Sequence, residues 1–114
     1  MNLQTVIEKL DLKVLTAPVD FSQLKPTSGY SSDLLSCVMA GAKKDCLWVT
    51  LQSHDNIVAV AALLEMTAVI ITEDAQPDPS TITRANAKNI ILLSTSLSNF
   101  TVIGKLWDLG LRSE

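Results

Sequence analysis

Three short apolar runs along this chain each end in a cluster of polar side chains. The runs span residues 47–51, 68–71 and 90–93, and the polar clusters follow at residues 52–56, 72–74 and 94–96. Apolar β-branched runs separated by helix-length segments are typical of buried parallel strands with crossover helices. The pattern predicts a single α/β domain with a mostly parallel central sheet flanked by helices. It also predicts a polar ligand crevice at the carboxyl ends of the strands.

The first third of the chain adds two helices and two short strands to this pattern. Apolar residues recur at helical spacing over residues 3–10, which predicts an amphipathic helix. A second helix is expected over residues 34–41, with Ser32 or Asp33 as its cap. A short strand is expected at residues 13–16, and a strand or turn at residues 28–31.

Two more helices are expected near the end of the chain. Asp78-Pro79 is a strong helix start, and the polar segment at residues 79–87 predicts a solvated outer helix. Ser96 or Ser98 is placed to cap the last helix, which ends near Gly110. Its large apolar residues are expected to face the core: Phe100, Ile103, Leu106, Trp107 and Leu109.

The segment at residues 57–64 is apolar on every side of the predicted helix. A surface helix has one apolar stripe, whereas a helix that is apolar all round is covered on all sides. One sheet covers a single face, so the other face must meet a neighbouring helix or another subunit. This pattern favours a homodimer.

Composition and charge exclude some classes of binding partner. With 47% hydrophobic and 18% charged residues, the chain has the balance of a folded globular protein. The formal net charge of −3 and the lack of any basic cluster argue against nucleic acid and anionic membranes as partners. No apolar run reaches the ~20 residues of a membrane span. The amphipathic N-terminus lacks a signal-peptide pattern, so we expect a cytoplasmic location.

Catalytic and cofactor motifs are absent from the sequence. The four glycines form no phosphate-binding loop and no dinucleotide fingerprint. Gly104-Lys105 lacks both the earlier glycine and the following hydroxyl of a P-loop. Cys37, Cys46 and the single histidine, His54, have no metal-ligand spacing, so both cysteines are expected as free thiols. We therefore expect a non-enzyme with no cofactor and no metal.

The polar residues after the strands leave alternatives open. His54 follows the strongest strand, and its neighbours Ser53 and Asp55 suit the first turn of a helix better than a catalytic triad. Contact between His54 and a ligand remains an alternative. The acidic group at residues 73–78 is either a solvated loop or a site for acid–base chemistry or a hard cation. Hydroxyls at strand ends, as at Thr72, suit a polar ligand without a charge penalty.

Residues 28–74 resemble a known family. The segments GYSSDLLS at 29–36, LWVT at 47–50 and QSHDNIVAVA at 52–61 are similar to short stand-alone DRTGG-domain proteins of anaerobic bacteria. The resemblance continues through residues 77–79 and 94–98. Relatives include the non-catalytic N-terminal domain of HPr kinase/phosphorylase. The resemblance implies one DRTGG-like domain over residues 1–114 that dimerises and acts as a regulatory or ligand-sensing module.

The chain departs from the motif that gives the family its name. Ser53-His54 stand where the wider family has Asp-Arg, and Glu73-Asp74 follow Thr72 where the family has Gly-Gly. An arginine-dependent anion contact is therefore not implied for position 54.

Three functions remain to be separated. The leading hypothesis is a homodimeric regulatory module that binds a small polar ligand or a partner protein. The alternatives are a purely structural or protein-docking subunit, and a small enzyme that uses His54 with Asp33 or Asp74. The residues expected to line the crevice are Gly29, Tyr30, Ser31, Asp33, Gln52, Ser53, His54, Asn56, Thr72, Thr95 and Ser96.

Overall fold

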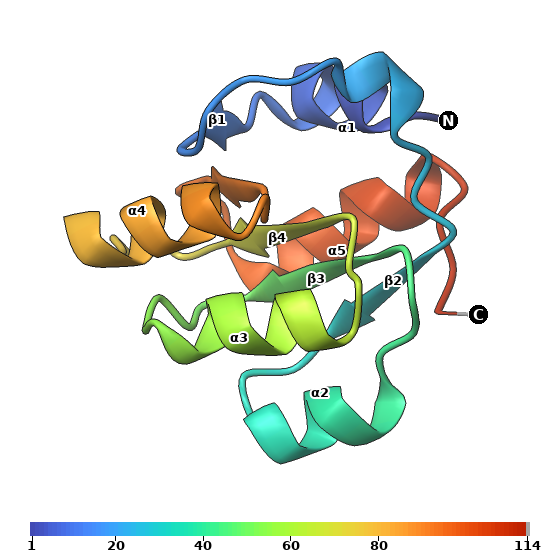
Figure 1. Cartoon of the computed structure of the whole chain (residues 1–114). Helices are drawn as coiled ribbons and strands as arrows, with labels where there is room; N and C mark the ends of the chain where they lie inside the picture. Colours follow the sequence, from blue (N-terminus) through green and yellow to red (C-terminus); the bar gives the residue numbers. More distant parts are fainter. Residues whose placement is uncertain (114) are drawn as a thin grey trace.

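Five strands form one mixed sheet in the computed structural model, which describes residues 1–113 (Figure 1). The order across the sheet is β1-β5-β4-β3-β2, and only β1 runs antiparallel, against β5. The mostly parallel α/β fold expected from the apolar runs is confirmed. The strands are β1 Lys13–Val14, β2 Ser28–Ser31, β3 Cys46–Thr50, β4 Ala68–Ile71 and β5 Leu92–Ser94.

Helices cover both faces of this sheet (Figure 1). Helices α2, α3 and α4 connect successive parallel strands and share one face, as right-handed crossovers between neighbouring strands require. Helices α1 and α5 pack together on the other face, with the short 3₁₀ helix η1. The bounds are α1 Leu3–Leu10, η1 Phe21–Gln23, α2 Leu35–Gly41, α3 Asn56–Leu63, α4 Pro79–Ala87 and α5 Asn99–Asp108.

The central strand β3 supplies both halves of the core. All five of its residues are buried. Leu47 and Val49 pack toward α1 and α5, whereas Cys46 and Trp48 pack toward α2, α3 and α4. This alternation follows from the two-residue period of a strand, and it explains why the run carries no polar face. Within residues 1–113, no helix is long and apolar enough to cross a bilayer.

The orientation expected for α5 is confirmed for Leu106 and Leu109, which pack in the core, and is wrong for Phe100, Ile103 and Trp107. Val102 and Leu106 face the core, but Phe100 is 87% exposed, and Ile103 and Trp107 are also exposed. Residues four apart share a helix face, so Val102 and Leu106 form a narrow apolar stripe. The three exposed residues form a second stripe on the outer side of the helix. Two apolar stripes on one helix leave the sequence alone unable to say which one packs inward.

Helix α3 is covered by the sheet and by α4 but not on its outer side. Ile57 and Val58 are almost fully buried, while Leu63 at the end of the helix is 66% exposed and Ala59 is exposed as well. The intrachain packing therefore leaves the outer apolar side of α3 open to solvent.

Candidate functional site

The expected site residues that follow the parallel strands lie at one end of the sheet, here called the carboxyl end. Asp33 follows β2, residues 52–56 follow β3, Thr72 follows β4, and residues 95–96 follow β5. Adjacent strands are ~4.8 Å apart, so the positions after β2 and β5 are separated by about 14 Å. The set spreads along the carboxyl end as a row.

Asp33 ties the turn after β2 to the turn after β3. Its Oδ1 accepts hydrogen bonds from the Thr50 hydroxyl and the Leu51 backbone N–H, both at 2.8 Å. The Gln52 side-chain amide donates to the Asp33 carbonyl oxygen at 3.0 Å. Asp33 was one of two residues expected to cap α2, but Leu34 occupies the N-cap, and the Leu34 N–H donates to Ser32 Oγ. Both Asp33 and Gln52 thus have structural partners.

A second network joins the turns after β4 and β5. Thr72 is fully buried, and its hydroxyl donates to Asn99 Oδ1 at the start of α5. The Asn99 N–H donates to Glu73 Oε2 at 2.9 Å, so a carboxylate of the chain itself sits at the positive end of the α5 dipole. Thr95 Oγ1 accepts from the Leu97 N–H at 3.1 Å. These polar groups of the carboxyl end are therefore engaged within the chain.

His54 and Asp55 do not form a catalytic pair. His54 is exposed, and its Nδ1 accepts a hydrogen bond from the Asn56 N–H at 3.2 Å. The Asp55 carboxylate accepts from the Thr81 hydroxyl and lies 3.8 Å from the Arg84 guanidinium. His54 therefore stabilises the start of α3, the role expected for its neighbours Ser53 and Asp55, because its Nδ1 accepts from a backbone N–H that has no partner within the helix.

The expected site residues on β2 and those after β5 line two separate cavities. Gly29, Tyr30 and Ser31 border a cavity of about 300 Å³ on the α5 side of the edge strand β2. Thr95 and Ser96 border another, of about 440 Å³, next to β1. The Tyr30 hydroxyl donates to the Cys37 carbonyl oxygen at 3.1 Å, and a side chain at Gly41 would come within 2.5 Å of that hydroxyl oxygen.

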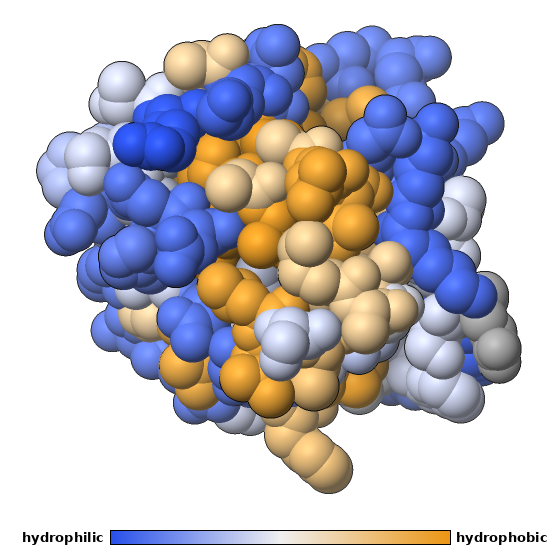
Figure 2. Space-filling model, turned by 60° about the horizontal axis from the view of Figure 1, so that its bottom comes forward, coloured by the Kyte–Doolittle hydropathy of each residue, from blue (hydrophilic) through white to orange (hydrophobic). Residues whose placement is uncertain are grey.

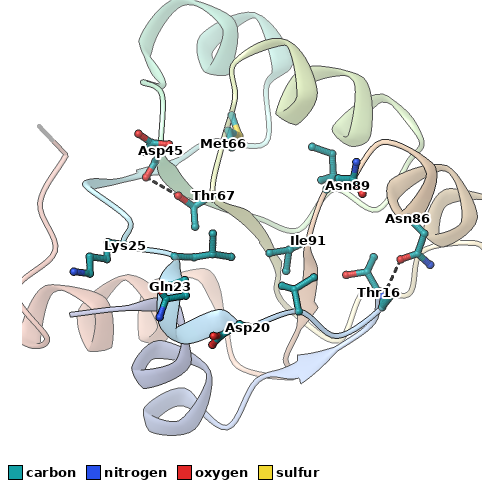
Figure 3. A pocket seen from close by; sticks show the side chains of 14 residues that line it. Thr16, Asp20, Gln23, Lys25, Asp45, Met66, Thr67, Asn86, Asn89 and Ile91 are labelled. Atoms are coloured by element: carbon teal, nitrogen blue, oxygen red, sulfur yellow. Dashed lines mark hydrogen bonds between the residues drawn. The ribbon is translucent and has the colours of Figure 1, made fainter.

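The largest of the three cavities described lies at the other end of the sheet (Figure 3). Its volume is about 600 Å³. We call it the amino-end cavity, because it lies where β3, β4 and β5 begin. Its lining includes Thr16, Gln23, Lys25, Asp45, Asn86 and Asn89. These residues come from segments that are distant in the sequence and share no motif, so the sequence offered no signal for this cavity.

The two cysteines are free thiols in different settings. Burial raises the pKa of the Cys46 thiol, so this side chain stays protonated as part of the core. Cys37 is exposed on α2. Within residues 1–113, no group of three potential metal-ligating side chains is found.

Comparison with known proteins places this architecture in a family. The model of the DRTGG domain matches residues 32–108 of the 114. The chain belongs to the DRTGG domain family. A comparison with curated proteins found no match.

A solved DRTGG-containing structure has the same fold. It is the crystal structure of the CBS and DRTGG domains of the regulatory region of Clostridium perfringens pyrophosphatase, complexed with its activator diadenosine tetraphosphate. The TM-score is 0.73 at 16% identity, over 91% of this chain. This DRTGG chain spans 45% of the length of that structure, so the likeness shows the shared fold.

The turn after β4 gives a physical reason for glycines at this point of a DRTGG domain. Glu73 and Asp74 both have φ of 59°, in the left-handed region that favours glycine. Their N–H groups donate to the carbonyl oxygens of Leu97 and Thr95, at 2.9 and 3.1 Å. The backbone conformation that suits a glycine pair is therefore adopted here by two acidic residues, with its donors already engaged within the chain.

Proposed function

We propose that this DRTGG domain is a non-catalytic regulatory module that acts as a cytoplasmic homodimer and responds to a small polar ligand or a partner protein at its carboxyl end. Family membership supports a regulatory role. The alternative of an enzyme that uses His54 with Asp33 or Asp74 is weakened, because Asp33 is hydrogen-bonded to Thr50 and Leu51 and His54 Nδ1 accepts from the Asn56 N–H. We take residues 1–31 as part of the same domain, since α1 packs on α5 and β1 pairs with β5.

The main observation in favour of a dimer is the apolar surface formed by α2 and α3. Figure 2 shows hydrophobic residues gathered across the side of the molecule that lies at the bottom of Figure 1, where α2 is. Leu34 is 61% exposed, and Met39 on α2 and Leu63 on α3 are exposed as well. Large apolar side chains clustered on neighbouring helices are typical of interaction sites. We propose that the same surface of a second copy covers them, as in an isologous dimer.

This surface is connected to the carboxyl end through α2. Asp33 lies directly before Leu34 and is hydrogen-bonded to Thr50 and Leu51. A ligand or partner that competes for the Asp33 carboxylate would release the start of α2 and thereby move part of the proposed interface. This link gives the module a physical route from ligand binding to a change in assembly.

Sedimentation of the purified chain over a wide range of concentrations tests the dimer. We expect a dimer that Leu63→Glu converts to a monomer, because the change places a charge in the interface while the exposed position leaves the fold intact. Phe100→Glu, the same kind of change on the opposite sheet face, is the matched control and should leave a dimer. A monomeric parent protein, or a dimer lost only in Phe100→Glu, would overturn this interface.

Thermal unfolding with candidate ligands tests the regulatory role. Nucleotides and dinucleoside polyphosphates are the first compounds to use, because the pyrophosphatase regulatory region is complexed with such an activator. A ligand at about a hundred times its dissociation constant should add roughly 2.7 kcal/mol to the free energy of unfolding. We expect His54→Ala to reduce this shift and Lys9→Ala, on α1, to preserve it. Equal shifts in both variants would exclude the carboxyl end as the ligand surface.

A docking subunit is the second candidate, and the exposed stripe on α5 favours it. Phe100, Ile103 and Trp107 form an apolar strip on the face opposite to the proposed dimer interface. A partner protein bound along α5 would leave the homodimer intact. In that case no small ligand would change the melting temperature, and Phe100→Glu would abolish partner binding while Leu63→Glu would not.

A further inference from the structure

The amino-end cavity is open to solvent and is bordered by segments that are already held in place. Residues 16–25 cross the starts of the strands and are fastened on both sides (Figure 3). The Ala17 N–H donates to Asn86 Oδ1 at 2.8 Å, and the Leu92 N–H donates to Thr16 Oγ1 at 3.2 Å. At the other side, the Leu3 N–H donates to the Leu24 carbonyl oxygen at 2.8 Å. The cavity is thus preformed, as ligand pockets commonly are.

The lining combines an apolar floor with side-chain amides. Met66, Ile90 and Ile91 supply apolar surface, and all three lie at the boundary of the core with less than 10% of their surface exposed. Asn86 uses its Oδ1 to hold Ala17, which leaves both hydrogens of its Nδ2 group for a ligand. Among residues 1–113, no hydrogen bond engages the side-chain amide of Asn89, which also lines the cavity.

Charge on the lining opposes an anionic ligand. Asp20 and Asp45 contribute two carboxylates and Lys25 contributes one ammonium group, so the lining carries an excess negative charge. A phosphate placed here would face this excess with a single cation. A neutral ligand with several donors and acceptors meets no such penalty. Asp20 Oδ1 accepts from Ser22, but carboxylate oxygens that the fold leaves free, such as Asp20 Oδ2, can accept hydrogen bonds from sugar hydroxyls.

We propose that the amino-end cavity binds an uncharged purine nucleoside. The free carboxamide of Asn89 can pair with the adjacent donor and acceptor of a purine edge, and the Nδ2 group of Asn86 can donate to a further acceptor. The thioether of Met66 suits contact with an aromatic ring. The cavity volume of about 600 Å³ is in the range of small-molecule sites. Binding here needs neither the dimer nor a ligand at the carboxyl end, because the two ends of the sheet are separate surfaces.

Two-dimensional NMR of the ¹⁵N-labelled chain, titrated with adenosine, guanosine and their monophosphates, tests the site. We expect saturable shifts at residues 16–25, 66–67 and 86–91. The nucleoside should bind at least about fivefold more tightly than its monophosphate, because the phosphate adds charge of the disfavoured sign. The proposal is overturned if neither nucleoside gives saturable shifts up to about 5 mM, where even a millimolar complex is mostly formed. Shifts confined to the carboxyl end, or tighter binding of the monophosphate, would overturn it as well.

Isosteric variants sharpen the test. Asn86→Asp keeps the oxygen that holds Ala17 and removes the Nδ2 donor, so the fold should persist while nucleoside affinity falls by at least about fivefold. Asn89→Asp makes the corresponding change in the next turn, and an aspartate tolerates its φ of 57°. Gln4→Glu makes the same amide-to-carboxylate change on α1, outside the cavity, and should leave affinity unchanged. Equal losses in all three variants, or none in the two cavity variants, would contradict the proposed recognition by amides.

Discussion

The two ends of the sheet use their polar residues in opposite ways. At the carboxyl end, Asp33 and Thr72 are hydrogen-bonded to neighbouring turns and hold those turns together. At the amino end, Asn86 holds one loop with its oxygen and keeps its nitrogen available, while Gln23 and Asn89 line an open cavity. A polar side chain is available to a ligand only if the fold does not already use its donors and acceptors.

This contrast changes how a row of polar residues after parallel strands should be interpreted. Such a row is expected to meet a ligand because the strand ends converge there. In this domain the connections after β4 and β5 go to opposite faces of the sheet, and a crevice would open between them. At that position, however, the backbone N–H groups of Glu73 and Asp74 donate hydrogen bonds to the carbonyl oxygens of Leu97 and Thr95. The polar residues nearest this point therefore stabilise the fold.

The largest expected effect on stability comes from removing the hydrogen bonds of Asp33 at the carboxyl end. Asp33→Ala should lower the free energy of unfolding by about 2–3 kcal/mol, because it leaves the buried Thr50 hydroxyl without its acceptor. Gln23→Ala, which removes an exposed amide at the amino end, should change it by less than about 0.5 kcal/mol. Urea unfolding of both variants measures the difference. Equal effects would show that the two ends do not differ in the way described above.

An intermediate effect is expected from the thiol that begins β3. The pKa of Cys46 is raised by burial, so above the ordinary thiol pKa of about 8.5 the unfolded chain loses this proton before the folded chain does. The contribution of this thiol to the free energy of unfolding should therefore be constant below that pH and fall as the pH rises above it, by no more than the limit of about 1.4 kcal/mol per pH unit for one proton. Cys46→Ala should flatten this slope. Cys37→Ser, at the exposed thiol, should retain it, and a slope that disappears only in Cys37→Ser would contradict the assignment.

The smallest effect is expected at the left-handed turn after β4. Asp74→Gly should raise the free energy of unfolding by up to about 1 kcal/mol, because glycine adopts the φ of 59° without the strain of a side chain. Asp74→Ala keeps a Cβ and should bring no gain. Thermal unfolding of the two variants provides the measurement, and a gain of the same size in both would show that backbone strain is not the cause.

Most of the secondary structure could be predicted because its signals are local. Helices α1 and α4 lie at the residues expected from apolar spacing and from Asp78-Pro79, and the three buried runs are strands. Ser98, one of two expected caps for α5, accepts from the Thr101 N–H. The inward face of α5 could not be predicted, because Phe100 and Trp107 are as apolar as the residues that pack on the sheet.

The candidate site could be predicted only in its position. The apolar runs predicted parallel strands, so the polar clusters that follow them were expected at one end of the sheet, and they lie there. Whether each side chain is free depends on partners distant in sequence, as for Thr72 with Asn99 and Asp55 with Thr81. The ligand-binding role of that end remains a prediction.

The sequence by itself determined the α/β class, the order of the elements and the DRTGG resemblance, because apolar period, caps and motif residues are local properties of the chain. Only the tertiary structure decided which polar groups are used within the fold and which line a cavity. The amino-end cavity exists because residues 16–25 fold across the starts of three strands and place Gln23 across the cavity from Asn86 and Asn89. No local sequence pattern predicts which residues line this cavity, since the lining depends on how distant segments pack against one sheet.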